Sequence, residues 1–403
     1  MTSREPPPVE RFRPADLDGR DWGALRAGCP VSRTTTPDGA GAWLLTRYAD
    51  VRAVLGSPLF SVSPIDPDRG HGTAEANESI FQDPPEHTRL RGLVAGPFAA
   101  NRVGVHAPGI RAKADALLAA MVGAGGPVDV MSAFAKPLTM NVIAGIVGIP
   151  EPDRPMAQRL SDQLLVPLSQ AQGSIALAGW RQFNDYVLGL VAERRKRPGE
   201  EDDLIAHLLR AQEADSSLTD VELVTMVLGL PVAGYVSTAN AIAVAFLHLL
   251  DGGWLERLRA GDAGLADRFV EEVLRIQSGD NGESMPRFAT GDTVVGGVRI
   301  SRGEQVVAPL VAANRDEELF ADGDAFDPDR ERLGRHLAFG FGIHRCLGAN
   351  LARLELRVAV AAVVESGLRA RMLEGWHEVP WHVNMLGDRF PERLLIAVDG
   401  GAP

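Results

Sequence analysis

Cys346 is the residue of this chain best placed to do chemistry. It stands in a glycine-rich stretch, Phe339–Gly348, which reads Phe-Gly-Phe-Gly-Ile-His-Arg-Cys-Leu-Gly and directly precedes a predicted helix. A helix N-terminus stabilises negative charge and lowers the pKa of a nearby thiol. We therefore expect Cys346 to be a thiolate, acting either as a nucleophile or as a metal ligand. The glycines let the backbone approach a large flat group, and His344 and Arg345 offer hydrogen-bond donors to anionic groups beside it.

The number of cysteines limits the metal sites that are possible. The chain has 403 residues and two cysteines, too few for a disulfide framework, so a reducing cytoplasm is the expected location. A lone cysteine cannot complete a zinc or iron–sulfur site, which leaves a centre with one thiolate ligand, such as haem. We expect the second cysteine, Cys29, to be a free and half-buried thiol.

The cysteine stretch resembles the haem-binding loop of the cytochrome P450 family, Phe-Gly-x-Gly-x-His-x-Cys-x-Gly, at every fixed position. Other segments resemble the family in the same order along the chain: Asp83–Arg91, Glu272–Arg275, Pro286–Arg287, Ala313–Asp316 and Phe326–Arg330. The resemblance covers nearly the whole chain. It implies the family's fold, a single domain that is mainly α-helical with small β-sheets, and haem b with its iron as the cofactor.

The resemblance also implies roles for individual residues. Burying a dianionic porphyrin requires cationic partners, so arginines and histidines are expected to converge on its propionates. The implied haem-binding residues are His87, Arg91, Arg287, Phe339, Gly340, His344 and Cys346, with Cys346 as the iron ligand. Glu272, Arg275 and Arg330 would form a structural cluster behind the haem. Taken alone, Glu272 and Arg275 at i and i+3 are equally typical of an exposed helical ion pair.

The chain departs from the family in the long helix that carries Ala-Gly-x-Glu/Asp-Thr-Thr. Here the sequence is Ala-Gly-Tyr-Val-Ser-Thr over residues 233–238, so Val236 replaces the acid and Ser237 the threonine. In the family, the acid and the alcohol relay protons to dioxygen. Because valine cannot relay a proton, we expect Ser237, ordered water or the substrate to do so. One interpretation is that water replaces the acid; the other is oxidation without oxygen insertion.

The second interpretation is itself a resemblance, to family members that cross-link cyclodipeptides. Ala-Gly-x-Val/Ile-Ser-Thr and the C-terminal Arg389–Leu394 are similar to those enzymes, whereas Leu386–Asp388 differs from them. This implies oxidative C–C or C–N coupling, with dimerisation, of a tryptophan-containing diketopiperazine. The residues expected to line the substrate pocket are Asn77, Trp180, Val236, Met385, Leu386 and Asp388.

Two other functions are considered. One is a conventional monooxygenase that hydroxylates or epoxidises an apolar secondary metabolite; the other is a non-catalytic haem-thiolate sensor or recruitment protein. The chain has no flavin or iron–sulfur segment, so the resemblance implies electrons from NAD(P)H through a ferredoxin reductase and a ferredoxin. Arg335, His336 and Arg345 are expected to form a basic docking patch for the ferredoxin, whose attraction weakens with salt.

These residues must be positioned by elements that the sequence also predicts. A β-rich part is expected at about 30–60, with a hairpin over Val31–Arg47 that turns at Pro37–Gly39, and a helix over Tyr48–Leu55. A helical core follows at about 87–276, then a small sheet at about 287–310, the haem-cysteine loop at 339–348, a helix at 349–364 and final strands at 381–398. Thr219 and Glu222 form a capping box, and Pro231 is expected to kink the helix that follows. All 403 residues are expected to form one domain.

Charge and hydropathy exclude two classes of partner. The chain has 53 acidic and 41 basic residues, a net charge of −12, which argues against nucleic-acid binding because a phosphate backbone requires a basic surface. Leu223–Leu250 has no charged side chain, long enough to raise the question of a membrane span. It contains a proline and several polar residues that are costly in lipid, so we expect a buried helix of the core.

Overall fold

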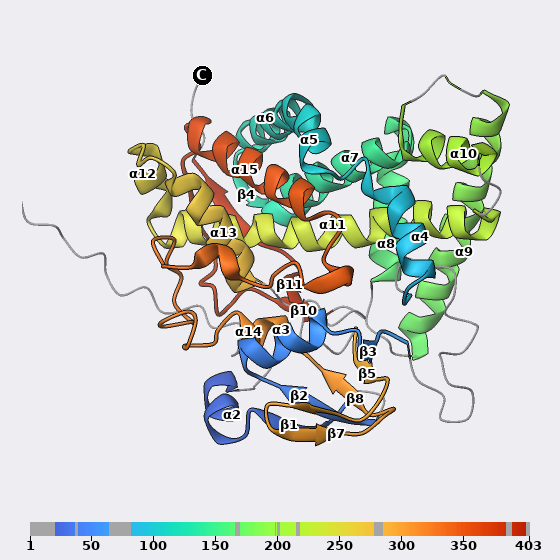
Figure 1. Cartoon of the computed structure of the whole chain (residues 1–403). Helices are drawn as coiled ribbons and strands as arrows, with labels where there is room; N and C mark the ends of the chain where they lie inside the picture. Colours follow the sequence, from blue (N-terminus) through green and yellow to red (C-terminus); the bar gives the residue numbers. More distant parts are fainter. Residues whose placement is uncertain are drawn as a thin grey trace, which may run out of the picture.

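The computed structural model describes residues 21–36, 39–63, 82–165, 170–197, 199, 202–214, 218–277, 285–383 and 389–399. Helices dominate, and the strands of these residues form four small sheets at the margins of the helical body. In Figure 1 the sheet that contains β1, β2, β5 and β8 lies at one end of the molecule, and most helices lie above it. The predicted fold class, mainly α with small β-sheets, is confirmed.

The helices appear largely where the apolar periodicity predicts them. They are α2 (Trp22–Gly28), α3 (Tyr48–Gly56), α4 (Glu86–Ala95), α5 (Ala100–Val103), α6 (Ala107–Ala124), α7 (Lys136–Val147), α8 (Arg154–Leu164), α9 (Gln170–Lys196), α10 (Leu204–Ala214), α11 (Asp220–Asp251), α12 (Trp254–Arg259), α13 (Leu265–Gln277), α14 (Leu310–Ala313) and α15 (Ala349–Glu365). Short single turns are η2 (Gly104–His106), η3 (Met131–Ala135), η4 (Glu151–Asp153), η5 (Leu333–Arg335) and η6 (Gly342–His344).

The two β-rich regions that the sequence predicts separately form one sheet. Its order is β1 (Val31–Thr35), β2 (Gly41–Leu45), β8 (Gln305–Val307), β5 (Arg287–Ala289) and β3 (Phe60–Ser61). The predicted hairpin is confirmed as β1 antiparallel to β2, and two of its three predicted turn residues lie outside the described residues. The parallel pairing of β2 with β8 joins distant parts of the chain.

Three smaller sheets complete the strands. β6 (Thr293–Val295) and β7 (Val298–Ile300) form a hairpin around the two glycines where the sequence predicts it. β12 (Leu395–Val398) pairs with β4 (Gly126–Asp129) and β9 (Ala370–Met372), which joins the last strand to the segment between α6 and α7. β10 (Trp381–Val383) pairs with β11 (Arg389–Pro391).

Helix α11 is the central helix of the fold. The predicted capping box at its start is confirmed: the Thr219 N–H donates to Glu222 Oε2 at 2.9 Å, and the Glu222 N–H donates to Thr219 Oγ1 at 3.2 Å. The helix continues without a break through Pro231. It is the one helix among the described residues that is long and apolar enough to cross a membrane. However, 78% of its most apolar 18-residue stretch is buried by the rest of the protein.

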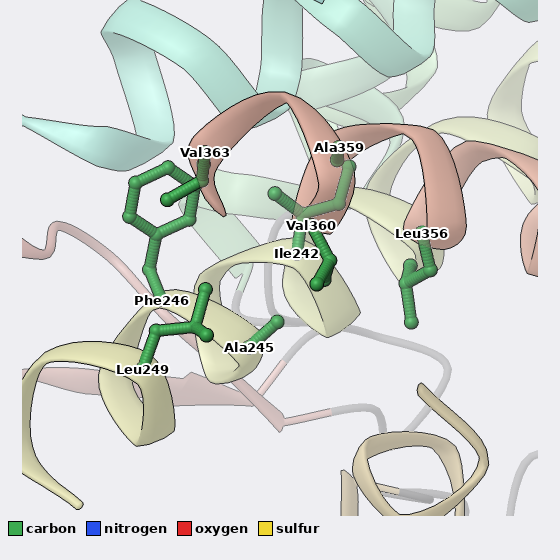
Figure 2. Close-up of a pocket in the computed structure, with 8 residues that line it drawn as sticks. All are labelled: Ile242, Ala245, Phe246, Leu249, Leu356, Ala359, Val360 and Val363. Carbon is green, nitrogen blue, oxygen red and sulfur yellow. The ribbon is translucent and has the colours of Figure 1, made fainter. Parts of the chain in front are cut away.

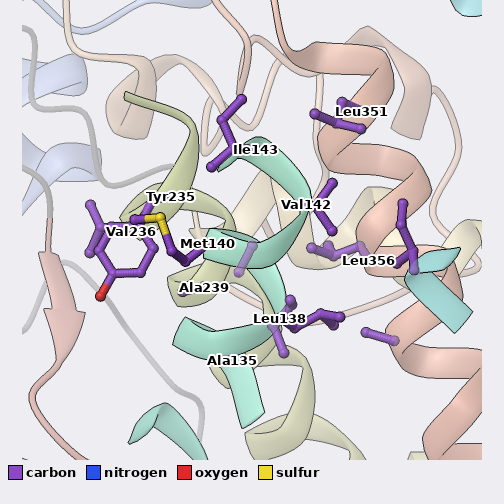
Figure 3. Packing of buried hydrophobic residues seen from close by; sticks show 14 of the residues in the cluster. Ala135, Leu138, Met140, Val142, Ile143, Tyr235, Val236, Ala239, Leu351 and Leu356 are labelled. Carbon is purple, nitrogen blue, oxygen red and sulfur yellow. The ribbon is translucent and has the colours of Figure 1, made fainter. Parts of the chain in front are cut away.

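The main apolar core gathers around α11. Figure 3 shows Met140 and Ile143 of α7 near Tyr235 and Val236 of α11, all members of this core cluster. On another side, Ile242, Ala245, Phe246 and Leu249 of α11 face Leu356, Ala359, Val360 and Val363 of α15 across a narrow apolar crevice (Figure 2). The helix that carries Ser237 and the helix that follows Cys346 are therefore packed directly against each other.

Candidate haem and active site

The loop that carries Cys346 has a fixed backbone. The Cys346 N–H donates to the Phe339 carbonyl at 2.8 Å, and the Gly340 N–H donates to the Leu337 carbonyl at 2.8 Å. Gly340 and Gly342 have φ values of 68° and 77°, a region that side chains rarely adopt. The glycine spacing thus bends the chain so that Cys346 comes just before α15.

The same loop is held from outside by helix α3. A Cβ atom at Gly342 would lie 2.4 Å from the Leu55 carbonyl oxygen, so a side chain there is excluded. At Gly56, a Cβ would lie 2.9 Å from the Phe341 ring. The guanidinium carbon of Arg52 stacks 4.1 Å from the centre of that ring. This close packing of α3 explains part of the glycine pattern without reference to any cofactor.

The Cys346 thiol is more basic than the sequence suggests. Burial raises the pKa of the Cys346 thiol, although the Gly348 N–H and the charges of Arg91, Arg345 and Arg353 act in the opposite direction. The expectation that the helix N-terminus makes it a thiolate is therefore wrong for the protein alone, because desolvation outweighs these donors. The surrounding protein desolvates the thiol, although the residue as a whole keeps exposed surface. A bound iron cation would deprotonate it outright.

The predicted propionate ligands lie together beside this loop. The His87 and His344 ring centres are 4.4 Å apart, and Arg91 donates a hydrogen bond to the Arg345 carbonyl. Burial, followed by the charges of His87, Arg287 and Arg91, lowers the pKa of His344 to about 4. Burial and Arg91 also lower the pKa of His87. The structure thus gathers four basic groups that disfavour one another's charges.

This cluster fits the propionates of a haem. His87 is 2% exposed, and neither of its ring nitrogens has a hydrogen-bond partner. Buried polar atoms are normally satisfied, so an imidazole without partners beside Arg91 indicates a missing acceptor that carries negative charge. Two propionates would supply it, and the nearby Cys346 thiol would supply the iron ligand. We conclude that the residues present fit haem.

The predicted structural cluster behind this site is present and buried. Arg275 is fully buried and bonds both oxygens of Glu272 at 2.7 Å. Its remaining donors bond the carbonyls of Asn314, Gly323 and Ala325, in and between the family-like segments Ala313–Asp316 and Phe326–Arg330. Arg330 Nε lies 3.4 Å from Glu272 Oε1. One carboxylate therefore holds two guanidinium groups and fixes the chain that leads to the cysteine loop.

Helix α11 presents a short, mostly apolar face with one hydroxyl. Ala233 and Ser237 are exposed, and Gly234 lies between them partly exposed. The Ser237 hydroxyl donates to the Ala233 carbonyl at 3.1 Å. Val236 is 3% exposed and lies in the core cluster with α7. Its roles as the position of the missing acid and as a pocket wall stay predictions.

Other predicted residues are dispersed. Trp180 lies on α9 and is about half exposed; its role as a pocket wall stays a prediction. Asn77, Met385, Leu386 and Asp388 lie outside the described residues, and their roles also stay predictions. The docking role of His336 is wrong, because its ring is buried and its Nε2 lies 2.9 Å from Glu271 Oε2. Arg335 and Arg345 are exposed.

Sequence reasoning missed two polar networks near the site. The Tyr235 hydroxyl donates to Asp162 Oδ1 at 2.8 Å, and Lys136 Nζ lies 2.9 Å from the same oxygen. Glu271 and Arg353 form a bidentate pair beside His336. The position of Glu271 on a helix, directly before Glu272, could be read from the sequence. No sequence pattern, however, pairs Glu271 with Arg353.

Comparisons with known proteins agree with this geometry. A family model described as cytochrome P450 matches residues 137–252 and 263–366. The mycinamicin IV hydroxylase/epoxidase of Micromonospora griseorubida is 37% identical over 393 residues, which are 96% of this chain and 97% of that protein. The cytochrome P450 monooxygenase PikC of Streptomyces venezuelae is 39% identical over 350 residues, 85% of this chain and 82% of that protein.

A solved structure extends the agreement to three dimensions. The chain is similar to the putative thioether synthase SgvP, described as involved in the tailoring step of griseoviridin, with a TM-score of 0.85 and 31% identity. The alignment covers 98% of this chain and 100% of that one. The element order from α2 to β12 therefore corresponds to a known fold along nearly its whole length.

Proposed function

The chain belongs to the cytochrome P450 family and is an oxidoreductase, and from that premise we propose that it inserts oxygen into an apolar secondary metabolite. Relatives named hydroxylase/epoxidase and monooxygenase support oxygen insertion. The sequence alone favours oxidative coupling over oxygen insertion, whereas the relatives favour oxygen insertion. A non-catalytic role has no support among these relatives.

The observation that carries the proposal is the combination of Cys346 in its glycine-rich loop with the buried His87 beside Arg91, whose ring nitrogens have no hydrogen-bond partner. Cys346 would bind the iron, while His87, Arg91, Arg287 and His344 would hold the propionates. When bound, the thiolate-ligated haem supplies reductive activation of dioxygen. The protein's own contribution is to bury the porphyrin's charges among cations, which hold the cofactor in one orientation.

We propose that residues of α11 contact the substrate and pass a proton toward dioxygen. Ala233 and Gly234 offer a small apolar surface, which favours an apolar substrate. Ser237 holds the one hydroxyl on this face, and its proton lies against the Ala233 carbonyl in this structure. We propose that it turns from this carbonyl to pass a proton toward dioxygen, taking over from the acid that Val236 replaces.

A second candidate function is favoured by Val236 itself. A site without an acid suits oxidation by removal of hydrogen, as in oxidative C–C or C–N coupling of two aromatic diketopiperazines. The solved structure with the 0.85 TM-score is titled a putative thioether synthase rather than a hydroxylase. In this alternative, Ser237 serves the same proton transfer, and the substrate radical attacks a second ring.

The product mass separates the two functions. The haem-loaded protein would be incubated with NADPH, ferredoxin reductase and ferredoxin, and with panels of macrolide-like metabolites and of tryptophan- and tyrosine-containing cyclodipeptides. We expect a product that is one oxygen atom heavier than its substrate. A product of two substrates that lacks two hydrogens would overturn oxygen insertion and establish coupling. A chain that binds no haem would overturn both.

We further propose that the electrons come from a ferredoxin and that the protein works in the cytoplasm. Arg335 and Arg345 are exposed near the cysteine loop, and Arg52 is exposed over Phe341 in the same loop. Together these three exposed arginines would give a local basic surface to a protein whose net charge is −12. An acidic ferredoxin complements such a surface, which would steer it toward the haem.

A further inference from the structure

An ion pair joins α13 to α15 beside the cysteine loop. Arg353 Nε lies 2.7 Å from Glu271 Oε1, and Arg353 Nη2 lies 2.9 Å from Glu271 Oε2. The two side chains are only 18% and 17% exposed. A bidentate geometry holds the planar guanidinium in one orientation, which a single contact to a flexible lysine would not do.

His336 fixes the other side of the carboxylate. The Ala338 N–H donates to His336 Nδ1 at 3.2 Å, which makes Nδ1 the acceptor and leaves Nε2 to donate to Glu271 Oε2 at 2.9 Å. Burial raises the pKa of Glu271, but the hydrogen bonds from His336 and Arg353 outweigh it and bring the pKa to about 2. Glu271 is therefore a carboxylate at neutral pH and keeps Arg353 in place.

Arg353 in turn contacts the cysteine loop. Its guanidinium carbon lies 4.6 Å from the centre of the Phe339 ring, within the range of a cation–π interaction. The carbonyl of the same Phe339 accepts the hydrogen bond of the Cys346 N–H at 2.8 Å. The Arg353–Glu271 pair therefore contacts Phe339, the residue whose carbonyl holds the backbone of Cys346.

Three arginines, Arg91, Arg345 and Arg353, are close enough for their charges to act on the Cys346 sulfur. Arg345 is exposed, so water and salt screen it. Arg91 belongs to the cationic cluster that propionates would neutralise. Arg353 is the one that is mostly buried and held in a fixed orientation by its bidentate pair with Glu271.

We propose that Arg353, positioned by Glu271 and His336 against Phe339, raises the reduction potential of the thiolate-bound haem iron. The inference rests on the proposed haem-thiolate function. Arg353 is a positioning residue, because it acts through Phe339 and through its field at Cys346 without touching substrate. Reduction adds an electron next to this fixed cation, so the cation stabilises the reduced state more than the oxidised one.

The test is the ferric/ferrous potential of the haem-loaded protein, measured by spectroelectrochemical titration without substrate. We expect Arg353→Gln to lower the reduction equilibrium constant about tenfold, which is about 59 mV for one electron. Arg353→Lys keeps the charge and should stay closer to the wild-type potential than Arg353→Gln does. Equal potentials for Arg353→Gln and wild type would overturn the proposal.

The chain offers a matched control on the same two helices. Arg357, one turn along α15, bonds Asp267 of α13 at 2.7 Å, but both side chains are largely exposed. Arg357→Gln removes the same charge from the same helix and should leave the potential unchanged. A shift as large as that of Arg353→Gln would show a general effect of helix charge and contradict a specific role.

In Arg353→Gln the Glu271 carboxylate is left without its partner, which could by itself destabilise the fold or shift the potential. A double variant separates these effects from the loss of the Arg353 charge. Glu271→Gln combined with Arg353→Gln leaves no unpaired buried charge and should still lower the potential. Recovery of the wild-type potential would show that the bare Glu271 carboxylate caused the shift, which would overturn the proposal. The haem spectrum of the wild type is recorded first: absence of haem binding refutes the proposed function, whereas bound haem with an unmoved potential refutes this inference alone.

Discussion

The Ser237 hydroxyl lies on the exposed face of α11, beside a valine where the family has an acid. In Ser237→Ala the chain loses the hydroxyl that we propose passes the proton. We expect product formation to fall about 10²-fold, the low end for loss of a general acid, while more of the NADPH is spent on hydrogen peroxide. The measurement is the ratio of product to peroxide per NADPH consumed.

Ser237→Thr restores the hydroxyl and is the matched control for this change. It should keep a ratio near that of the wild type. If Ser237→Ala also keeps that ratio, the proton reaches dioxygen through water or through the substrate, and Ser237 has no part in its delivery.

Helical spacing predicts the positions of some residues correctly, whereas closeness in sequence to the cysteine loop gives a wrong position for another. Glu272 and Arg275 could be paired from the sequence because a helix brings i and i+3 to one face. Its position just before the cysteine loop predicts a surface position for His336, yet its ring is buried and bonds Glu271 on α13. Position along a chain gives no direction for a side chain in a loop, so such residues need the tertiary contact to be placed.

Helix α13 is anchored by one carboxylate that serves two arginines, Arg275 and Arg330. Glu272→Gln leaves Arg275, which is fully buried, without its counter-charge. We expect the free energy of unfolding to fall by about 3–5 kcal/mol, as when one partner of a buried pair is removed. Urea unfolding followed by circular dichroism measures this change.

Asp267→Asn on the same helix is the comparison for this prediction. Asp267 pairs with Arg357 on the exposed side, and such pairs contribute about 0–1 kcal/mol. Similar losses in the two variants would mean that the buried cluster adds nothing beyond an ordinary surface pair.

Local elements were predictable and distant pairings were not. The hairpin of β1 and β2, the helix that begins at Tyr48 and the capping box at Thr219 each follow from residues that are close in sequence. The sheet that joins Ala42–Leu44 to Gln305–Val307 does not, because no local pattern specifies which distant strand is the partner. The sequence therefore predicts two separate β-rich regions, whereas the structure joins them in one sheet.

For the whole molecule, charge distribution matters more than net charge. Arg345→Glu reverses one charge of the basic surface near the cysteine loop. We expect the rate of haem reduction by an acidic ferredoxin to fall about tenfold at low salt, with the product unchanged. Stopped-flow reduction at two ionic strengths measures this, and the difference should shrink as salt increases.

Arg210→Glu provides the same charge reversal elsewhere. Arg210 is exposed on α10, and Figure 1 shows that helix on the outer side of the helical body. It should leave the rate of reduction close to that of the wild type. Equal slowing by both variants would show that net charge alone governs the encounter and would contradict docking at the loop.

The contact of Gly342 with Leu55 has a consequence for the history of such chains. This glycine is required by the neighbouring helix whether or not a porphyrin is present. A lineage that lost its haem but kept this fold would remain under selection to keep the glycine. The presence of this glycine is therefore evidence of the fold, whereas the capacity to bind haem is better judged from Cys346 together with its neighbouring cations.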